Sequence, residues 1–209
     1  MSDHFRSSFS LENKTPHALS SSKSINIDTI VTILETILLF ENLLFLYTEN
    51  IKFELTPWVL SCIGGRNMEK KLNHLLADLV VEYHKLQSFH WYLKGYHFFD
   101  DHAKLEEYYD AIAEAVDTVA EDMLMLGFKP ESTMKGFLSI SSIEEAKNQE
   151  VTSVEAYEAV LADFKYLLDE VKGVKAAADE SGDYLTSTKM DDYIEFFSKA
   201  IWMVGQEVR

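Results

Sequence analysis

Apolar side chains recur at alternating spacings of four and three residues from position 72 onward. This is the period of a helix that turns one face toward a core. The first stripe comprises Leu72, Leu76, Leu79, Tyr83, Leu86, His90 and Leu93. Gly95 follows it, and glycine is frequent just beyond a helix end. The pattern predicts an amphipathic helix that begins at Met68 and stops before Gly95.

Three further stripes of the same period follow. The second comprises His102, Leu105, Tyr109, Ile112, Val116, Val119, Met123 and Leu126. Gly127 and Pro130 come directly after it and form a strong stop signal. A third helix is expected over residues 152–180, closed by Gly182, and a fourth after Thr186, which is expected to cap it.

The connection over residues 131–150 is long and serine-rich, whereas the other two connections are short. Residues 142–147 are expected to form a short helix within it. Only 8 glycines and 3 prolines occur in 209 residues, which favours long helices over a turn-rich β fold. The prediction is an all-α four-helix bundle with one long crossover between its second and third helices.

Residues 1–67 lack this clear pattern and are expected to be an N-terminal extension to a domain at 68–209. The first 24 residues are polar and predicted to be disordered. Residues 25–53 are apolar, but acidic residues interrupt them, so an amphipathic helix is expected rather than a membrane span. No signal peptide is recognisable, and we expect a cytoplasmic protein without membrane contact.

A second hypothesis concerns the junction itself. Gly64 and Gly65 lie just before Met68, and two glycine codons can encode a purine-rich ribosome-binding sequence. Met68 would then be the true start of translation, and residues 1–67 would be a misassigned upstream region. The intact mass of the native protein distinguishes the two hypotheses.

Charge and composition exclude several classes of function and site. Lys and Arg number 19 and Asp and Glu 35, a net charge of −16, and residues 68–209 alone carry 14 basic and 28 acidic side chains. This balance argues against tracking of nucleic-acid phosphates. The single cysteine, Cys62, excludes an intramolecular disulfide and a CxxC-type zinc site. Phosphate-binding glycine loops and nucleophile-elbow motifs are absent from the sequence.

All seven histidines lie at or before position 102. A di-iron site inside one ferritin-type bundle needs Glu-x-x-His pairs on two helices, and the predicted third and fourth helices contain no histidine, so that site is excluded. Two pairs four residues apart remain on the second helix: His102 with Glu106, and Asp117 with Glu121. Each pair places imidazole or carboxylate groups on one helix face, and such groups suit iron.

Simpler interpretations exist for these residues, namely core histidines and a solvated acidic face. The mutual placement favours a site. His90 and His102 are equidistant from residue 96, so an antiparallel hairpin brings them level. Asp117 lies roughly 22 Å along the helix from His102, yet on a similar side. A two-fold axis near residues 111–113 would pair each half of the site with the other half from a second subunit.

These motifs resemble the Dps family of mini-ferritins over about residues 69–205. The resemblance rests on residues 73–78 (NHLLAD), 89–95 (FHWYLKG), 98–102 (FFDDH) and 117–121 (DTVAE), with Thr186 and residues 201–203 (IWM). It implies a ferritin-like bundle that assembles into a hollow dodecamer. It also implies a ferroxidase that oxidises Fe(II), preferentially with hydrogen peroxide rather than dioxygen, stores ferric mineral and protects DNA and cell from oxidative damage.

Carried onto this chain, the resemblance assigns iron ligands to both members of a dimer. His90, His102 and Glu106 match ligands from one subunit, and Asp117 and Glu121 match ligands from its two-fold mate. Trp91 matches the aromatic residue beside the iron. The acidic turn of Asp179, Glu180 and Asp183 could line a pore for incoming Fe(II), with a solvated loop as the alternative. Direct DNA binding is not expected, since only Lys70 and Lys71 stand near the domain start.

Two positions depart from the family pattern. Glu106 stands where the family usually has aspartate, and Asp122 stands where arginine commonly follows the motif glutamate. Glutamate is one methylene longer than aspartate, so the position of the carboxylate relative to a metal changes at residue 106. Asp122 removes any ion pair that the arginine would make at the subunit interface. The alternatives to a working ferroxidase are therefore a non-catalytic helical assembly protein and an iron-binding shell with impaired oxidation.

Overall fold

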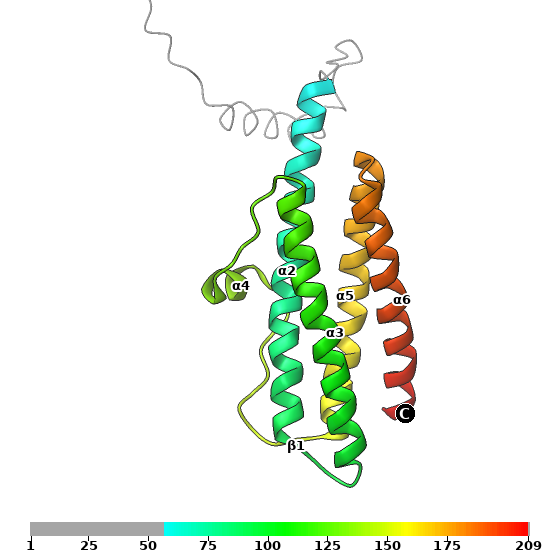
Figure 1. Cartoon of the computed structure of the whole chain (residues 1–209). Coiled ribbons are helices and arrows are strands. Elements are labelled where there is room, and N and C mark those ends of the chain that lie inside the picture. The colour runs from blue at the N-terminus through cyan, green and yellow to red at the C-terminus, as the bar shows by residue number, and fades with distance from the viewer. Residues whose placement is uncertain (1–56, 209) are drawn as a thin grey trace, which may run out of the picture. The chain divides into compact units, whose positions relative to one another are not determined.

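The computed structural model describes residues 57–208, and the predictions made for residues 1–56 lie outside this range. Its elements in chain order are α2 (Pro57–Tyr92), β1 (Leu93–Lys94), α3 (Phe98–Met125), α4 (Met134–Ile140), β2 (Val151–Thr152), α5 (Ser153–Ser181) and α6 (Tyr184–Glu207). Figure 1 shows α2, α3, α5 and α6 running alongside one another as a bundle, with α4 beside α2. The all-α bundle with a long crossover is confirmed.

The core of the bundle is built from the predicted stripes. α2 packs against α3 and α5, and α5 packs against α6. At the centre, the rings of Tyr108, Phe164, Phe196 and Phe197 contact one another edge to face or tilted, with centroids 5.1–6.4 Å apart. Such packing fixes the rotation of each helix about its axis, and therefore which residues each helix presents outward.

The predicted helix ends after Met125 and Ser181 are confirmed, and glycine explains both. Gly127 and Gly182 adopt φ values of 77° and 74°, in the left-handed region where other residues are strained. The start of α5 is equally well defined by a capping box, in which the Thr152 side chain accepts from the Glu155 amide and Glu155 accepts from the Thr152 amide.

Helix starts differ from the predictions at two places. α2 begins at Pro57 rather than at Met68, and Met68 is buried within it. α6 is capped by Asp183, whose side chain accepts from the amide of Thr186, whereas Thr186 itself is buried inside the first turn. Threonine is a common N-cap residue, which is why Thr186 was predicted. The N-cap position is instead occupied by Asp183, three residues earlier, whose carboxylate accepts the hydrogen bond.

The short helix of the crossover exists but was predicted at the wrong place. It spans Met134–Ile140, where Thr133 caps it by accepting from the amide of Gly136. Residues 142–147 are not helical. The amides of Ser142 and Ile143 donate to the buried carboxylate of Asp78, which holds this stretch in a non-helical conformation.

A two-residue parallel pairing joins the two halves of the bundle and was not predicted. Leu93 pairs with Val151 and Lys94 with Thr152, which places the α2–α3 turn beside the start of α5. Among residues 57–208, no helix combines the length and the apolar character required to cross a membrane.

Candidate metal centre

His90 and His102 stack face to face at the α2–α3 hairpin, as their spacing about residue 96 predicted. Their ring centroids are 3.6 Å apart and the planes differ by 19°. The Nδ1 of His90 bonds the backbone carbonyl of His102 at 2.8 Å, and the Nδ1 of His102 bonds the carbonyl of His90 at 2.9 Å. The two residues therefore hold each other in place through reciprocal hydrogen bonds.

These bonds determine which ring nitrogen is the donor. A carbonyl only accepts, so each Nδ1 carries a hydrogen, and in the corresponding neutral tautomer Nε2 presents a lone pair. A hydrogen bond from the ring nitrogen that does not bind the metal is the usual way in which a metal-binding histidine is oriented. His90 is 8% exposed, and the ring of Phe98 stacks on His102 with centroids 4.9 Å apart. The pair is thus prepared for ligation by Nε2.

Glu106 is connected to this pair through Tyr109. The Tyr109 ring meets His90 edge to face, with centroids 5.3 Å apart. The pKa of Tyr109 is raised, first because burial disfavours the phenolate and then because its hydroxyl donates to Glu106, whose charge also opposes ionisation. Glu106 is exposed, and among the described residues its carboxylate does not form a close group of ligand atoms with the two rings.

Asp117 and Glu121 lie further along α3, and both are exposed. A single subunit does not bring them to the histidines, because His102 stands on the same straight helix 15 residues earlier, roughly 22 Å away along its axis. This placement is what a site shared between subunits requires, and it also fits a solvated acidic face.

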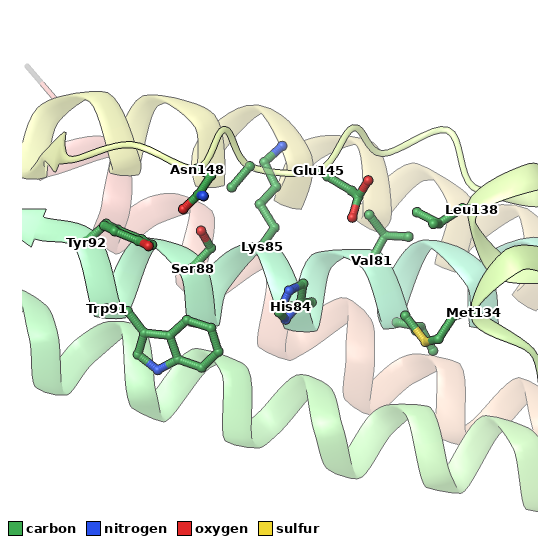
Figure 2. A pocket seen from close by; sticks show the side chains of 12 residues that line it. Val81, His84, Lys85, Ser88, Trp91, Tyr92, Met134, Leu138, Glu145 and Asn148 are labelled. Carbon is green, nitrogen blue, oxygen red and sulfur yellow. The ribbon is translucent and has the colours of Figure 1, made fainter.

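Trp91 is an exposed aromatic residue that follows His90 on α2. Its ring is 59% exposed and meets His84 edge to face, with centroids 5.9 Å apart. Figure 2 shows it at one end of a groove between α2 and the crossover, where Glu145 and Asn148 lie opposite Lys85. An exposed indole at this position is available for packing against another molecule.

Asp122, one of the two departures from the family pattern, is turned inward. It is 3% exposed and forms an ion pair with Lys189 of α6. The side chain at this position thus stabilises the α3–α6 contact within one subunit.

The acidic α5–α6 turn has structural roles of its own. Asp183 caps α6, and Asp179 accepts a hydrogen bond from Ser187 at 2.5 Å. Glu180 is exposed. Two of the three predicted pore residues therefore help to shape the turn, which is compatible with a pore formed by several copies.

A second group of metal-ligating side chains was missed by the sequence reasoning. In residues 65–208, His74, Asp78 and Glu170 place one ligand atom each within 4.8 Å of one another. The spacing of His74 and Asp78 equals that of His102 and Glu106, so the signal was present on α2. The third member, Glu170, is on α5, 92 residues after Asp78, and no local pattern points to it.

Glu82 lies one helical turn beyond Asp78 and is fully buried. Within the part of the chain that the structure describes, neither of its carboxylate oxygens has a hydrogen-bond partner. Burial raises its pKa well above the ordinary value, and the nearby charge of Asp163 adds to this effect. The ion pair of Lys85 with Asp163, at 2.6 Å, lies beside it between α2 and α5.

Comparison with known proteins assigns the family. Residues 69–209 match the ferritin-like domain family. The chain is 39% identical over 140 residues to antigen TpF1 of Treponema pallidum, which covers 67% of this chain and 79% of that protein. It is 41% identical over 133 residues to DNA protection during starvation protein 2 of Bacillus anthracis, covering 64% and 90%.

A solved structure agrees with these relatives. The crystal structure of a Dps protein from Vibrio cholerae O1, described as a member of a broad superfamily of ferritin-like diiron-carboxylate proteins, superposes with a TM-score of 0.68. The two are 30% identical, and the match covers 70% of this chain and 92% of that one. The chain belongs to the Dps family of ferritin-like proteins.

Proposed function

We propose that this chain is a ferroxidase that forms a dodecameric shell, oxidises Fe(II) at sites between subunits and stores the ferric product inside. Membership of the Dps family supports iron sequestration and protection of DNA and cell against oxidative damage as the general function. The description of the Vibrio cholerae relative as a diiron-carboxylate protein supports iron as the metal and ferroxidation as the reaction.

The observation that carries the proposal is the reciprocal bonding of His90 and His102. Each backbone carbonyl holds the other residue's Nδ1–H, which leaves two Nε2 lone pairs, and Glu106 follows His102 by one helical turn on α3. A core histidine that served only packing would have no need of a free Nε2. Two imidazoles and one carboxylate form an incomplete N/O set, and it requires further oxygen ligands to hold iron well.

Asp117 and Glu121 supply those ligands from a two-fold mate. Both are exposed on α3, on a similar side of the helix to His102, so an axis near residues 111–113 lays each acidic pair against a histidine pair. Three carboxylates balance most of the charge that accumulates as Fe(II) becomes Fe(III). Trp91, exposed beside this hairpin, packs at the same interface.

Hydrogen peroxide is the oxidant in this proposal. One peroxide accepts two electrons, one from each of two Fe(II) ions, and two water molecules form when two protons are added. Two-electron reduction avoids release of hydroxyl radical. The acidic turn of Asp179, Glu180 and Asp183 attracts Fe(II) toward the interior where several copies of the turn meet.

The test is stopped-flow ferric absorbance of the protein loaded anaerobically with Fe(II) and then mixed with hydrogen peroxide. Rapid oxidation, with soluble iron that co-elutes with a large shell on size exclusion, supports the proposal. A rate equal to that of a protein-free control overturns it and favours a non-catalytic helical assembly. Replacing peroxide with dioxygen in the same experiment identifies the preferred oxidant.

A further inference from the structure

His74, Asp78 and Glu170 form a compact group between α2 and α5. The Nδ1 of His74 lies 2.9 Å from Oε2 of Glu170 and 3.5 Å from Oδ2 of Asp78. Around a four-coordinate cation with bonds of about 2.0–2.1 Å, neighbouring ligand atoms are roughly 3.3 Å apart. The two distances from His74 are therefore near the separation that a bound cation would impose, and the two carboxylate oxygens lie within 4.8 Å of each other.

The surrounding contacts aim the ligand atoms toward one another. Oδ1 of Asp78 accepts from the Ser141 hydroxyl and the Ser142 amide, at 2.8 and 2.7 Å, which turns Oδ2 toward His74. The Tyr166 hydroxyl donates to this Oδ2 at 3.0 Å.

The other nitrogen of His74 also has a partner. Its Nε2 lies 3.2 Å from the hydroxyl of Ser142, which can accept or donate. When Nδ1 coordinates a cation, the hydrogen moves to Nε2 and the hydroxyl accepts it. This is the outer-shell bond that metal-binding histidines regularly make.

The local charge favours a cation. Asp78 is fully buried, and Asp163 is 17% exposed at its side chain. Lys85 compensates the charge of Asp163 through their ion pair. The buried carboxylate of Asp78 gains from a bound positive charge beside it.

The group of His74, Asp78 and Glu170 is also accessible from solvent. The side chains of His74 and Glu170 are 31% and 30% exposed, whereas Asp78 is buried. A cation can reach the group from solvent, and a water molecule can complete its coordination from the exposed side.

From these observations we propose that His74, Asp78 and Glu170 bind a divalent transition cation, such as Zn²⁺ or Fe²⁺, within a single subunit. The cation joins α2, α5 and, through Ser142, the crossover. The site is separate from the predicted ferroxidase ligands, because His74 and His90 are 16 residues apart on one helix, roughly 24 Å. It does not depend on ferroxidase activity.

The test counts Zn²⁺ bound per chain after equilibrium dialysis of the full-length protein. Four proteins are compared: wild type, His74→Gln, Asp117→Ala/Glu121→Ala, and the triple variant. His74→Gln is expected to lose one Zn²⁺ per chain in both backgrounds. Ser142→Ala is expected to keep the site but bind Zn²⁺ about tenfold more weakly, as outer-shell losses do. An anomalous map at the zinc edge should show a peak between His74 and Glu170.

His84→Gln is the matched control, since His84 is an exposed histidine on α2 whose ring nitrogen contacts only Gln87, at 3.5 Å, among the described residues. It should bind as much Zn²⁺ as wild type. Unchanged Zn²⁺ in His74→Gln in both backgrounds would overturn the proposal. If ferrous oxidation is absent but His74→Gln still loses its Zn²⁺, the proposed function fails and this site stands. If ferrous oxidation is present but His74→Gln keeps all of its Zn²⁺, the proposed function stands and this site fails.

Discussion

The middle of α2 and its C-terminal end use histidine in opposite ways. At the hairpin, both Nδ1 atoms of His90 and His102 are bound by backbone carbonyls, and among the described residues no close group of three ligand atoms forms around the two rings. At the crossover, Nδ1 of His74 faces two carboxylates directly. The first arrangement needs a second subunit to become a metal site, whereas the second is complete in one.

The difference teaches that spacing alone does not define a histidine site. His74 with Asp78 and His102 with Glu106 share the same four-residue spacing and the same pair of chemical groups. The partner of each ring nitrogen decides which lone pair remains for a ligand, and that partner comes from another element. Variants around each of the two histidine groups can break or sharpen the comparison.

The largest expected effect is on catalysis. Asp117→Ala/Glu121→Ala should slow peroxide-dependent Fe(II) oxidation by at least about 100-fold, because it removes ligands rather than their outer-shell support. Stopped-flow absorbance measures the rate, and size exclusion checks that the shell persists. Glu114→Ala, an exposed carboxylate on the same helix, should leave the rate unchanged. Equal rates in wild type and the double variant would place the acidic pair outside the reaction.

Asp78→Asn should destabilise the crossover end of the bundle by about 2–3 kcal/mol, because an amide replaces a charged acceptor of several hydrogen bonds. Thermal unfolding at a fixed protein concentration gives the size of the loss, and limited proteolysis shows where it occurs. Cleavage should begin within residues 141–150. Glu144→Gln, an exposed crossover residue, serves as the control. A melting temperature equal to that of wild type would contradict the role given to Asp78.

Glu82→Gln should stabilise the protein by about 1–2 kcal/mol near pH 8, since it removes a buried carboxyl without a hydrogen-bond partner. The pKa of Glu82 is raised in the folded state, so the folded form binds its proton more tightly than the unfolded chain does. Wild-type stability therefore falls as pH rises from the ordinary carboxyl value, 4.5, up to the raised folded value.

The advantage of Glu82→Gln should consequently be small near pH 4.5 and grow with pH until it levels off. Melting temperatures of both proteins across this range test the expectation. A constant difference at all pH values would show that Glu82 ionises as freely in the fold as in the unfolded chain.

The smallest expected effect belongs to Glu106→Asp. The extra methylene of Glu106 still lets its carboxylate reach a metal beside His102, so restoring the family's usual residue should change the oxidation rate by less than about threefold, under 1 kcal/mol of activation free energy. A gain of more than about tenfold would instead support an iron-binding shell whose oxidation is impaired.

Much of the fold followed from the sequence because its signals are local. The stripes and the glycines at 127 and 182 predicted the bundle and two helix ends, and the symmetric spacing about residue 96 predicted the stacked histidines. The errors came from long-range contacts. Asp78 holds residues 142–143 in a non-helical conformation from 64 and 65 positions away, which no local propensity reveals.

The candidate site residues also divide into those that local sequence patterns can predict and those that depend on long-range contacts. His90, His102 and Glu106 could be grouped from one hairpin, whereas the contribution of Asp117 and Glu121 depends on a second copy of the chain and stays a prediction. Glu170 and Glu82 could not be found from sequence, because their significance lies in burial and in contacts between α2 and α5.

The bond between Asp78 and the crossover also bears on how the molecule opens. Surface loops ordinarily exchange their amide hydrogens quickly through small local fluctuations. The amides of Ser142 and Ile143 are held by a carboxylate that is itself buried within α2. Their exchange with deuterium should therefore follow the slow opening of the helix bundle rather than the motion of the surrounding loop.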